Sequence, residues 1–184
     1  MNFSLKPHQL VAHWVPGFVV LTMWLLADVH YANSHSNYVA QWFKINKLVG
    51  SGFGVLLVAI VPFVVGQVLD ALRNWNEDRL YKIEKKLKLE IKWMAEFKLN
   101  ETELNLFENT YFTYYVFSAN LCIGLTLGLV STIPLGIFPC DHWILFTVPV
   151  FIGIILFFRD ARSLRAEIRD ILDEVASRKT NENA

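Results

Sequence analysis

The sequence is poor in cysteine and in the short motifs that carry enzyme chemistry. Its 184 residues include only two cysteines, Cys122 and Cys140. One is expected inside an apolar helix and the other at the tip of a turn, so their spacing gives no metal motif and disfavours a disulfide between them. The chain has no glycine-rich phosphate loop, no HExxH sequence and no serine–histidine–aspartate arrangement. We therefore expect no enzyme activity and no cofactor.

Charged side chains and histidine are absent from the middle of four long apolar stretches. These stretches are Trp14–Ala27, Leu48–Leu72, Tyr111–Ile137 and Trp143–Phe158. Proton relays and ion-coupled transporters usually need such residues at mid-membrane, and no inverted repeat is apparent, so these functions are disfavoured. With 54% hydrophobic residues and a mean hydropathy of +0.35, the chain is more apolar than ordinary soluble domains. The sequence predicts an all-α integral membrane protein with four transmembrane helices.

The net charge is zero, but the charges are strongly segregated along the chain. Of the seventeen Lys and Arg, all except Lys6, Lys44 and Lys47 lie between Arg73 and Lys98 or after Phe158. Acidic residues share these two segments, so the segments are mixed-charge surfaces and no nucleic-acid partner is expected. The positive-inside rule places both termini and the central charged segment in the cytoplasm of a multi-pass protein of the cell (inner) membrane.

The second, third and fourth apolar helices continue into charged sequence without a breaker and are expected to extend into a cytoplasmic helical bundle. Asn100 followed by Glu103 predicts a capping box that starts the helix leading into the third span. The helix before it is expected to run on to about Phe97. The expected organisation is 1–72 for the first two spans and external loop, 73–110 for a cytoplasmic hairpin, 111–158 for the last two spans, and 159–184 for an amphipathic C-terminal helix.

Apolar side chains recur at helical spacing in both charged segments and predict a shared assembly seam. Neither segment can bury this seam alone, so the seam is expected to pack within the bundle, against other subunits or against a soluble protein. Its residues are Leu80, Ile83, Leu87, Met94, Phe97, Leu164, Ile168 and Ile171.

Small residues predict close helix contacts in the second and third spans. Gly50 and Gly54 form a small-xxx-small pair in the second span. In the third span a small and polar stripe shares one helix face, and it either lines a water-filled path or packs against a neighbouring helix. The stripe consists of Thr113, Asn120, Gly124, Gly128 and Ser131.

Two further groups of polar residues could bind a metal ion or a lipid head group. His30, His35 and His142 lie on the expected external side and are metal-competent, but they match no tight metal motif. Near the inner membrane surface, a group of five charged residues and one glutamine is expected to form ion pairs or to bind anionic lipid head groups. This group contains Gln67, Asp70, Arg73, Arg159, Asp160 and Arg162.

The outline of four spans with helices extended into the cytoplasm resembles oligomeric large-pore channels and small multi-span effectors of bacterial anti-phage systems. The resemblance lies in the outline alone, so no functional residue is transferred. The two small-residue pairs, the polar stripe and the cytoplasmic seams together favour, as the first hypothesis, a homo-oligomeric membrane protein that forms or gates a permeation path. By analogy with the defence effectors, such a protein would perturb the membrane. A non-catalytic membrane scaffold that recruits a soluble protein through the cytoplasmic hairpin is the alternative. A membrane enzyme with an external metal site is a third hypothesis.

Overall fold

A computed structural model describes the backbone of residues 7–34, 52–87, 91–92, 99–132 and 143–182. Side chains are described over 11–24, 60–86, 91–92, 99–131 and 147–177. In this part of the chain every regular element is a helix, as the sequence predicts. The elements are α1 (Pro7–Ser34), α4 (Gly52–Leu87), α5 (Glu101–Leu106), the π-helical turn η2 (Phe107–Phe112), α6 (Thr113–Thr132) and α7 (Trp143–Glu182).

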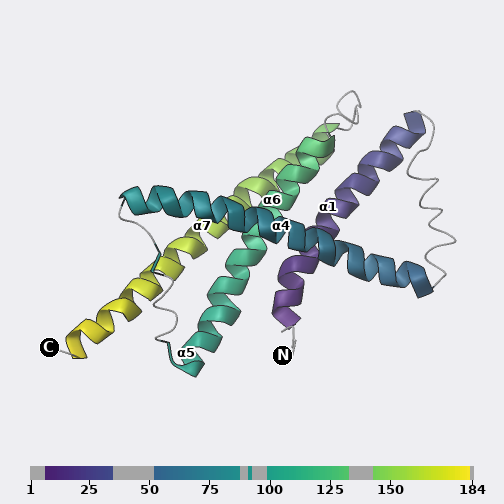
Figure 1. Ribbon diagram of the computed structural model, residues 1–184. Coiled ribbons are helices and arrows are strands. Elements are labelled where there is room, and N and C mark those ends of the chain that lie inside the picture. Colours follow the sequence, from purple (N-terminus) through teal and green to yellow (C-terminus); the bar gives the residue numbers. More distant parts are fainter. Residues whose placement is uncertain (1–6, 35–51, 88–90, 93–98, 133–142, 183–184) are drawn as a thin grey trace.

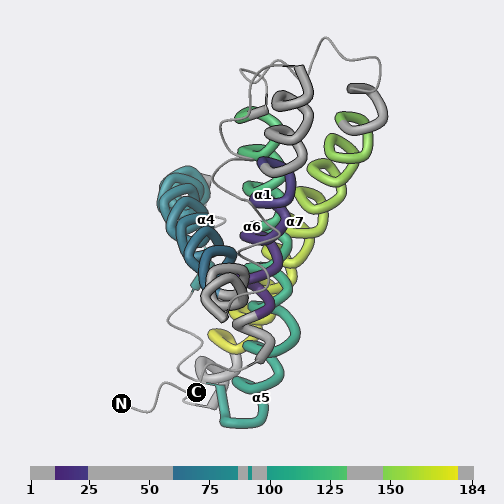
Figure 2. Tube along the Cα trace, turned by 90° about the vertical axis from the view of Figure 1, so that its right-hand side faces the viewer, coloured from purple at the N-terminus to yellow at the C-terminus, as the bar shows by residue number. Residues whose placement is uncertain are grey.

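The four long helices form two layers. α1, α6 and α7 lie in one layer, and α4 lies across them at a steep angle (Figure 1). After a quarter turn, α4 is seen nearly end-on at one side of the other three (Figure 2). α6 is the central helix, because α1, α4 and α7 all contact it.

One apolar segment in the described residues is long enough to cross a membrane. It covers Glu101–Ser131, which includes α5, η2 and most of α6, whereas the apolar run Val11–Trp24 is shorter. The core helix of a soluble protein can meet the same criterion, and 44% of the most apolar window of this segment is buried. The described helices thus provide one membrane-length segment, and the four-span arrangement stays a prediction.

The start of α5 follows the predicted capping box. The Asn100 side chain accepts a hydrogen bond from the Glu103 amide at 2.9 Å, and the Glu103 carboxylate accepts one from the Asn100 amide at 3.2 Å. From there the chain stays helical into α6, with a single π-helical turn between them. Thr113 donates its backbone N–H and its hydroxyl to the Glu108 carbonyl oxygen, and both bonds span the five residues of a π-turn.

The predicted extension of the second helix toward Phe97 is wrong. α4 ends at Leu87, and Ile91 and Lys92 are not helical. Ile91 is 3% exposed and belongs to a core formed with α6 and α7. Burying a large aliphatic side chain is worth about 1.5–3 kcal/mol, which favours the arrangement with Ile91 in this core. The chain therefore turns back from α4 toward the other helices.

The C-terminal helix behaves as the sequence predicts. α7 is continuous from Trp143 to Glu182 and passes from apolar to charged sequence without a break. Ile168 and Leu172 of its charged half are fully buried in one core with Phe107 of η2 and Tyr115 near the start of α6. A second, smaller core lies toward the other end of α6 and contains Met23, Leu121 and Leu125.

Candidate functional site

The crossing of α4 with α1 is the closest helix contact described. A Cβ added to Gly17 would overlap the Pro62 carbonyl oxygen and lie 2.8 Å from the Gly66 nitrogen. A Cβ added to Gly66 would overlap the His13 carbonyl oxygen and lie 2.6 Å from its carbonyl carbon. Only glycine lets two helix backbones approach this closely. These two glycines therefore fix the point at which α4 crosses α1.

The crossing brings a row of charged side chains on α4 into the interior. Asp70 Oδ1 accepts hydrogen bonds from Arg73 Nε at 3.1 Å and from Arg73 Nη2 at 2.9 Å. The other guanidinium nitrogen, Nη1, donates to Glu77. Arg73 is only 6% exposed, so it is a buried cation held between two carboxylates, each about one turn away from it on the same helix. Of the group that sequence analysis expected near the inner membrane surface, Asp70 and Arg73 form an ion pair, whereas Asp160 accepts a hydrogen bond from Ser118. Arg159 and Arg162 form no salt bridge among the described residues, and the common membrane depth of the group stays a prediction.

The row continues from α4 to α6 and α7. Tyr115 of α6 donates its hydroxyl to Glu77 Oε1 at 3.0 Å and accepts from Arg165 Nη1 at 3.1 Å. Arg165 of α7 also forms a two-point ion pair with Glu84, with hydrogen bonds of 3.0 and 2.9 Å. The guanidinium carbons of Arg73 and Arg165 lie 5.8 and 5.9 Å from the centre of the Tyr115 ring. Tyr115 thus joins the two arginines through both its ring and its hydroxyl.

The surroundings of Arg165 stabilise the charged form of its guanidinium. Burial alone lowers the pKa of this guanidinium, but the hydrogen bonds and charge of Glu84, with a contribution from Tyr115, raise the pKa above its ordinary value. Bidentate arginine–carboxylate pairs of this kind fix orientation as well as adding energy. The pair therefore ties α4 to α7 in one defined arrangement.

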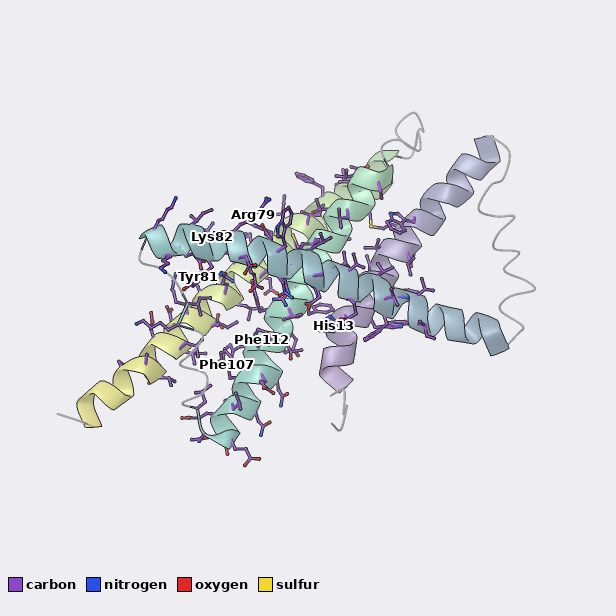
Figure 3. All side chains as sticks on the ribbon, viewed as in Figure 1. His13, Arg79, Tyr81, Lys82, Phe107 and Phe112 are labelled. Carbon is purple, nitrogen blue, oxygen red and sulfur yellow. The ribbon has the colours of Figure 1, made fainter. Side chains whose placement is uncertain are left out.

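The opposite end of the row lies beside α1. Asn120 of α6 is fully buried, and its amide nitrogen lies 3.4 Å from Asp70 Oδ1 and 3.5 Å from the Ala12 carbonyl oxygen. His13 Nδ1 lies 4.0 Å from the same Asp70 oxygen, and Figure 3 shows His13 where α1 passes α4. Neither His13 Nδ1 nor Asn120 Oδ1 has a hydrogen-bond partner among the described residues. These side chains together are called the polar row below. Its members are His13, Asp70, Arg73, Glu77, Glu84, Tyr115, Asn120 and Arg165.

The predicted polar and small stripe lies on α6, mainly against α1 and α4. Asn120 is part of the polar row, a Cβ on Gly124 would lie 3.0 Å from Val20 and 3.2 Å from Leu69, and Gly128 faces Met23. At the end of the stripe, Trp24 Nε1 donates to Ser131 Oγ at 2.6 Å. Thr113 at the other end bonds within its own helix. Of the two predicted roles, the contacts in this chain are those of helix packing.

The structure buries only some residues of the predicted assembly seam, and it leaves the Gly50–Gly54 pair outside the described side chains. Ile168 is fully buried, and Leu164 and Ile171 pack beside it in the same core. Leu80 and Ile83 of α4 remain 37% and 54% exposed, so these two seam residues are only partly covered by the described part of the chain. Gly54 and Leu87 fall in α4 at positions whose surroundings are outside the described side chains, and Gly50, Met94 and Phe97 lie outside the described residues.

No group of three or more metal-binding side chains occurs among the residues whose side chains are described. His30 lies in α1 beyond those side chains, and His35, His142 and Cys140 lie outside the described backbone. Cys122 is a free thiol. The proposed external metal site is therefore neither assembled nor tested in this part of the chain.

The polar row can hold helices in register, but it presents no activated nucleophile. Sequence analysis missed Glu77, Glu84, Tyr115 and Arg165 as members. A local signal existed for Glu77, because Asp70, Arg73 and Glu77 are spaced by three and four residues on one helix face. No local sequence pattern points to Tyr115 of α6 or Arg165 of α7, because these residues meet α4 only where the helices cross.

The chain is an all-α protein with four long helices in its described residues, one membrane-length apolar segment and a buried row of ion pairs between helices. No protein-family model, curated protein or solved structure matches it. The functional argument therefore rests on the chain's own residues.

Proposed function

We propose that the chain is a non-catalytic integral membrane protein. It acts as a helical scaffold that assembles through the charged C-terminal half of α4, which carries Leu80 and Ile83. The supporting observation is the apolar surface of α7, where six large side chains are 45–58% exposed within about three turns. Soluble monomers rarely expose a contiguous apolar patch of this kind, whereas lipid accommodates it. The six residues are Val148, Phe151, Ile152, Ile155, Leu156 and Phe158.

The charge distribution supports a four-span topology with both ends in the cytoplasm. α4 lies across α1, α6 and α7 (Figure 1). In that topology its axis is therefore inclined much further from the membrane normal than theirs. If α4 instead lies in the plane of the interface, three spans remain, and the two termini fall on opposite sides. Accessibility of tags at the two termini in sealed membranes separates these arrangements: four spans predict that neither tag is reached from outside.

The polar row gives such a scaffold a fixed shape. It joins α4 to α7 through paired charges and to α6 through the hydrogen bonds of Tyr115 and Asn120. Removing one partner of a buried charge pair typically costs about 3–5 kcal/mol. Toward the C-terminal end of α4, Leu80 and Ile83 are 37% and 54% exposed and form an apolar flank that the described residues leave uncovered. A rigid helix with an exposed apolar flank suits recruitment of a helical partner.

Substitution of the uncovered flank tests this proposal. Deleting the whole charged segment would also remove Glu84 and its ion pair with Arg165, so Leu80→Ser with Ile83→Ser is the sharper variant. Tyr81→Ser is the matched control, since Tyr81 is 39% exposed on the same helix. A scaffold should lose its partner in the double variant and keep it in the control. Unchanged assembly in both variants contradicts the proposal.

The second candidate is a homo-oligomer that forms or gates a pore, including a membrane-perturbing role in bacterial defence. The same exposed flank of α4 supports it, because identical copies could bury Leu80 and Ile83 against one another. The stripe on α6 is occupied by α1 and α4, so a path would have to run between subunits along other residues. Flux across liposomes carrying the purified protein tests this candidate, and a monomer without flux removes it.

A further inference from the structure

α4 has an outer face, opposite the polar row, whose chemistry changes along its length. Helical spacing of three, four and seven places four exposed apolar residues and then three exposed cations on one line of the helix. The apolar members are 37–57% exposed. In order, the outer face consists of Val61, Val64, Val68, Trp75, Arg79, Lys82 and Lys86.

The boundary between the two halves is marked by a stacked pair. The Arg79 guanidinium carbon lies 3.7 Å from the centre of the Trp75 ring, and Trp75 is 57% exposed. Figure 3 shows Arg79 and Lys82 on the half of α4 that leads to its C-terminal end. Tryptophan and arginine favour the level of the lipid head groups, where an apolar body and a polar tip can each find a suitable medium.

The cations of the outer face differ from those of the polar row in having no acidic partner. Arg73 and Arg165 are each paired with carboxylates. Arg79, Lys82 and Lys86 form no salt bridge with any residue among those described. Their charge is therefore available to an anion outside the chain.

We propose that the outer face of α4 lies against lipid and that Arg79, Lys82 and Lys86 bind the phosphate groups of anionic lipids. In this arrangement the valines contact acyl chains, Trp75 lies at the boundary, and the cations reach the head groups. The proposal rests on the membrane insertion proposed above and adds a lipid class and a binding surface to it.

The order of residues favours lipid over a water-soluble acidic partner. An acidic protein or nucleic acid would match the three cations but would leave the three valines in water. A bilayer matches both halves, since hydrocarbon is followed by the interface and then by anionic phosphates along one direction. The order of environments from the hydrocarbon to the head groups therefore matches the order of residues along the whole outer face.

The test measures lipid selectivity of the full chain in phosphatidylcholine bilayers. Trace spin-labelled phosphatidylglycerol or phosphatidylcholine is added, and the fraction of label immobilised by the protein is compared for the two lipids. The variant is Arg79→Gln with Lys82→Gln and Lys86→Gln. The matched control is Lys92→Gln, because Lys92 is also exposed but pairs with Asp173 at 3.0 Å. Helix content is checked by circular dichroism in all proteins.

We expect the native chain to prefer phosphatidylglycerol, and the preference to fall at least about fivefold in the triple variant, as one interfacial cation contributes roughly that factor. Lys92→Gln should stay within about twofold of the native chain, and added salt should weaken the preference. Equal binding of both lipids by the native chain, or equal loss in variant and control, overturns the inference. Failure of the native chain to enter phosphatidylcholine bilayers at all overturns the proposed function instead.

Discussion

Gly66→Ala should destabilise the protein, even though the same change stabilises an ordinary helix. Alanine is favoured over glycine inside a helix by about 1 kcal/mol. At residue 66, however, the new methyl group would lie 2.6 Å from the carbonyl carbon of His13 and 3.1 Å from its Cα. Ordinary carbon–carbon contact is about 3.5–4.0 Å, so α1 and α4 would have to separate by roughly 1 Å.

The separation would act on the polar row as well as on the crossing. Overpacking costs about 1–3 kcal/mol, and here the obstacle is backbone that cannot change rotamer. His13 and Ala12 are also the α1 residues nearest to Asp70 and Asn120, so the weak contacts at that end of the row would lengthen. We expect a net loss of up to about 2 kcal/mol after the gain in helix propensity is subtracted.

Thermal unfolding of the detergent-solubilised protein, followed by helix content, measures this loss. Gly153→Ala is the matched control, because its methyl group would meet only Leu125 Cδ1 at 3.2 Å, the end of a side chain that can move. The control should be neutral or slightly stabilised. A Gly66→Ala protein as stable as the control would refute the close crossing of α1 and α4.

The remaining predictions concern single contacts of the row and of the helix start. Arg165→Met should cost about 3–5 kcal/mol in detergent unfolding, and adding Glu84→Leu should recover part of it; an equal loss in both would show that the pair does not couple. Because the pKa of Arg165 is raised, its stabilising contribution is complete below the ordinary pKa of arginine, so the effect of Arg165→Met should be the same at pH 7 and pH 10. Asn100→Ala should cost about 1 kcal/mol and speed hydrogen exchange of the Glu103 amide, and unchanged exchange would refute the capping box.

Local features of the fold could be predicted from the sequence. The capping box needs only Asn100 and Glu103, three residues apart, and both of its hydrogen bonds are present. The continuity of α7 follows because no proline or glycine separates its apolar half from its charged half. The pairing of Asp70 with Arg73 follows in the same way from neighbouring positions on one helix.

Long-range features could not be predicted in this way. Gly17 and Gly66 are far apart in sequence, and nothing near either one shows that its partner is backbone from the other helix. The partnership of Glu84 with Arg165 exists only because α4 crosses the layer of α6 and α7. The end of α4 at Leu87 depends on the burial of Ile91, since the sequence between them contains good helix formers.

The most direct test of membrane insertion compares two spin labels on α7. The labels replace Ile155, which is 45% exposed on the apolar half, and Ser177, which is exposed on the charged half, in a chain whose native cysteines are changed to serine. In liposomes, the label at 155 should collide mainly with oxygen, which concentrates in hydrocarbon, and the label at 177 mainly with a water-soluble nickel complex. Nickel accessibility at 155 equal to that at 177 would contradict the proposal that α7 lies in the bilayer.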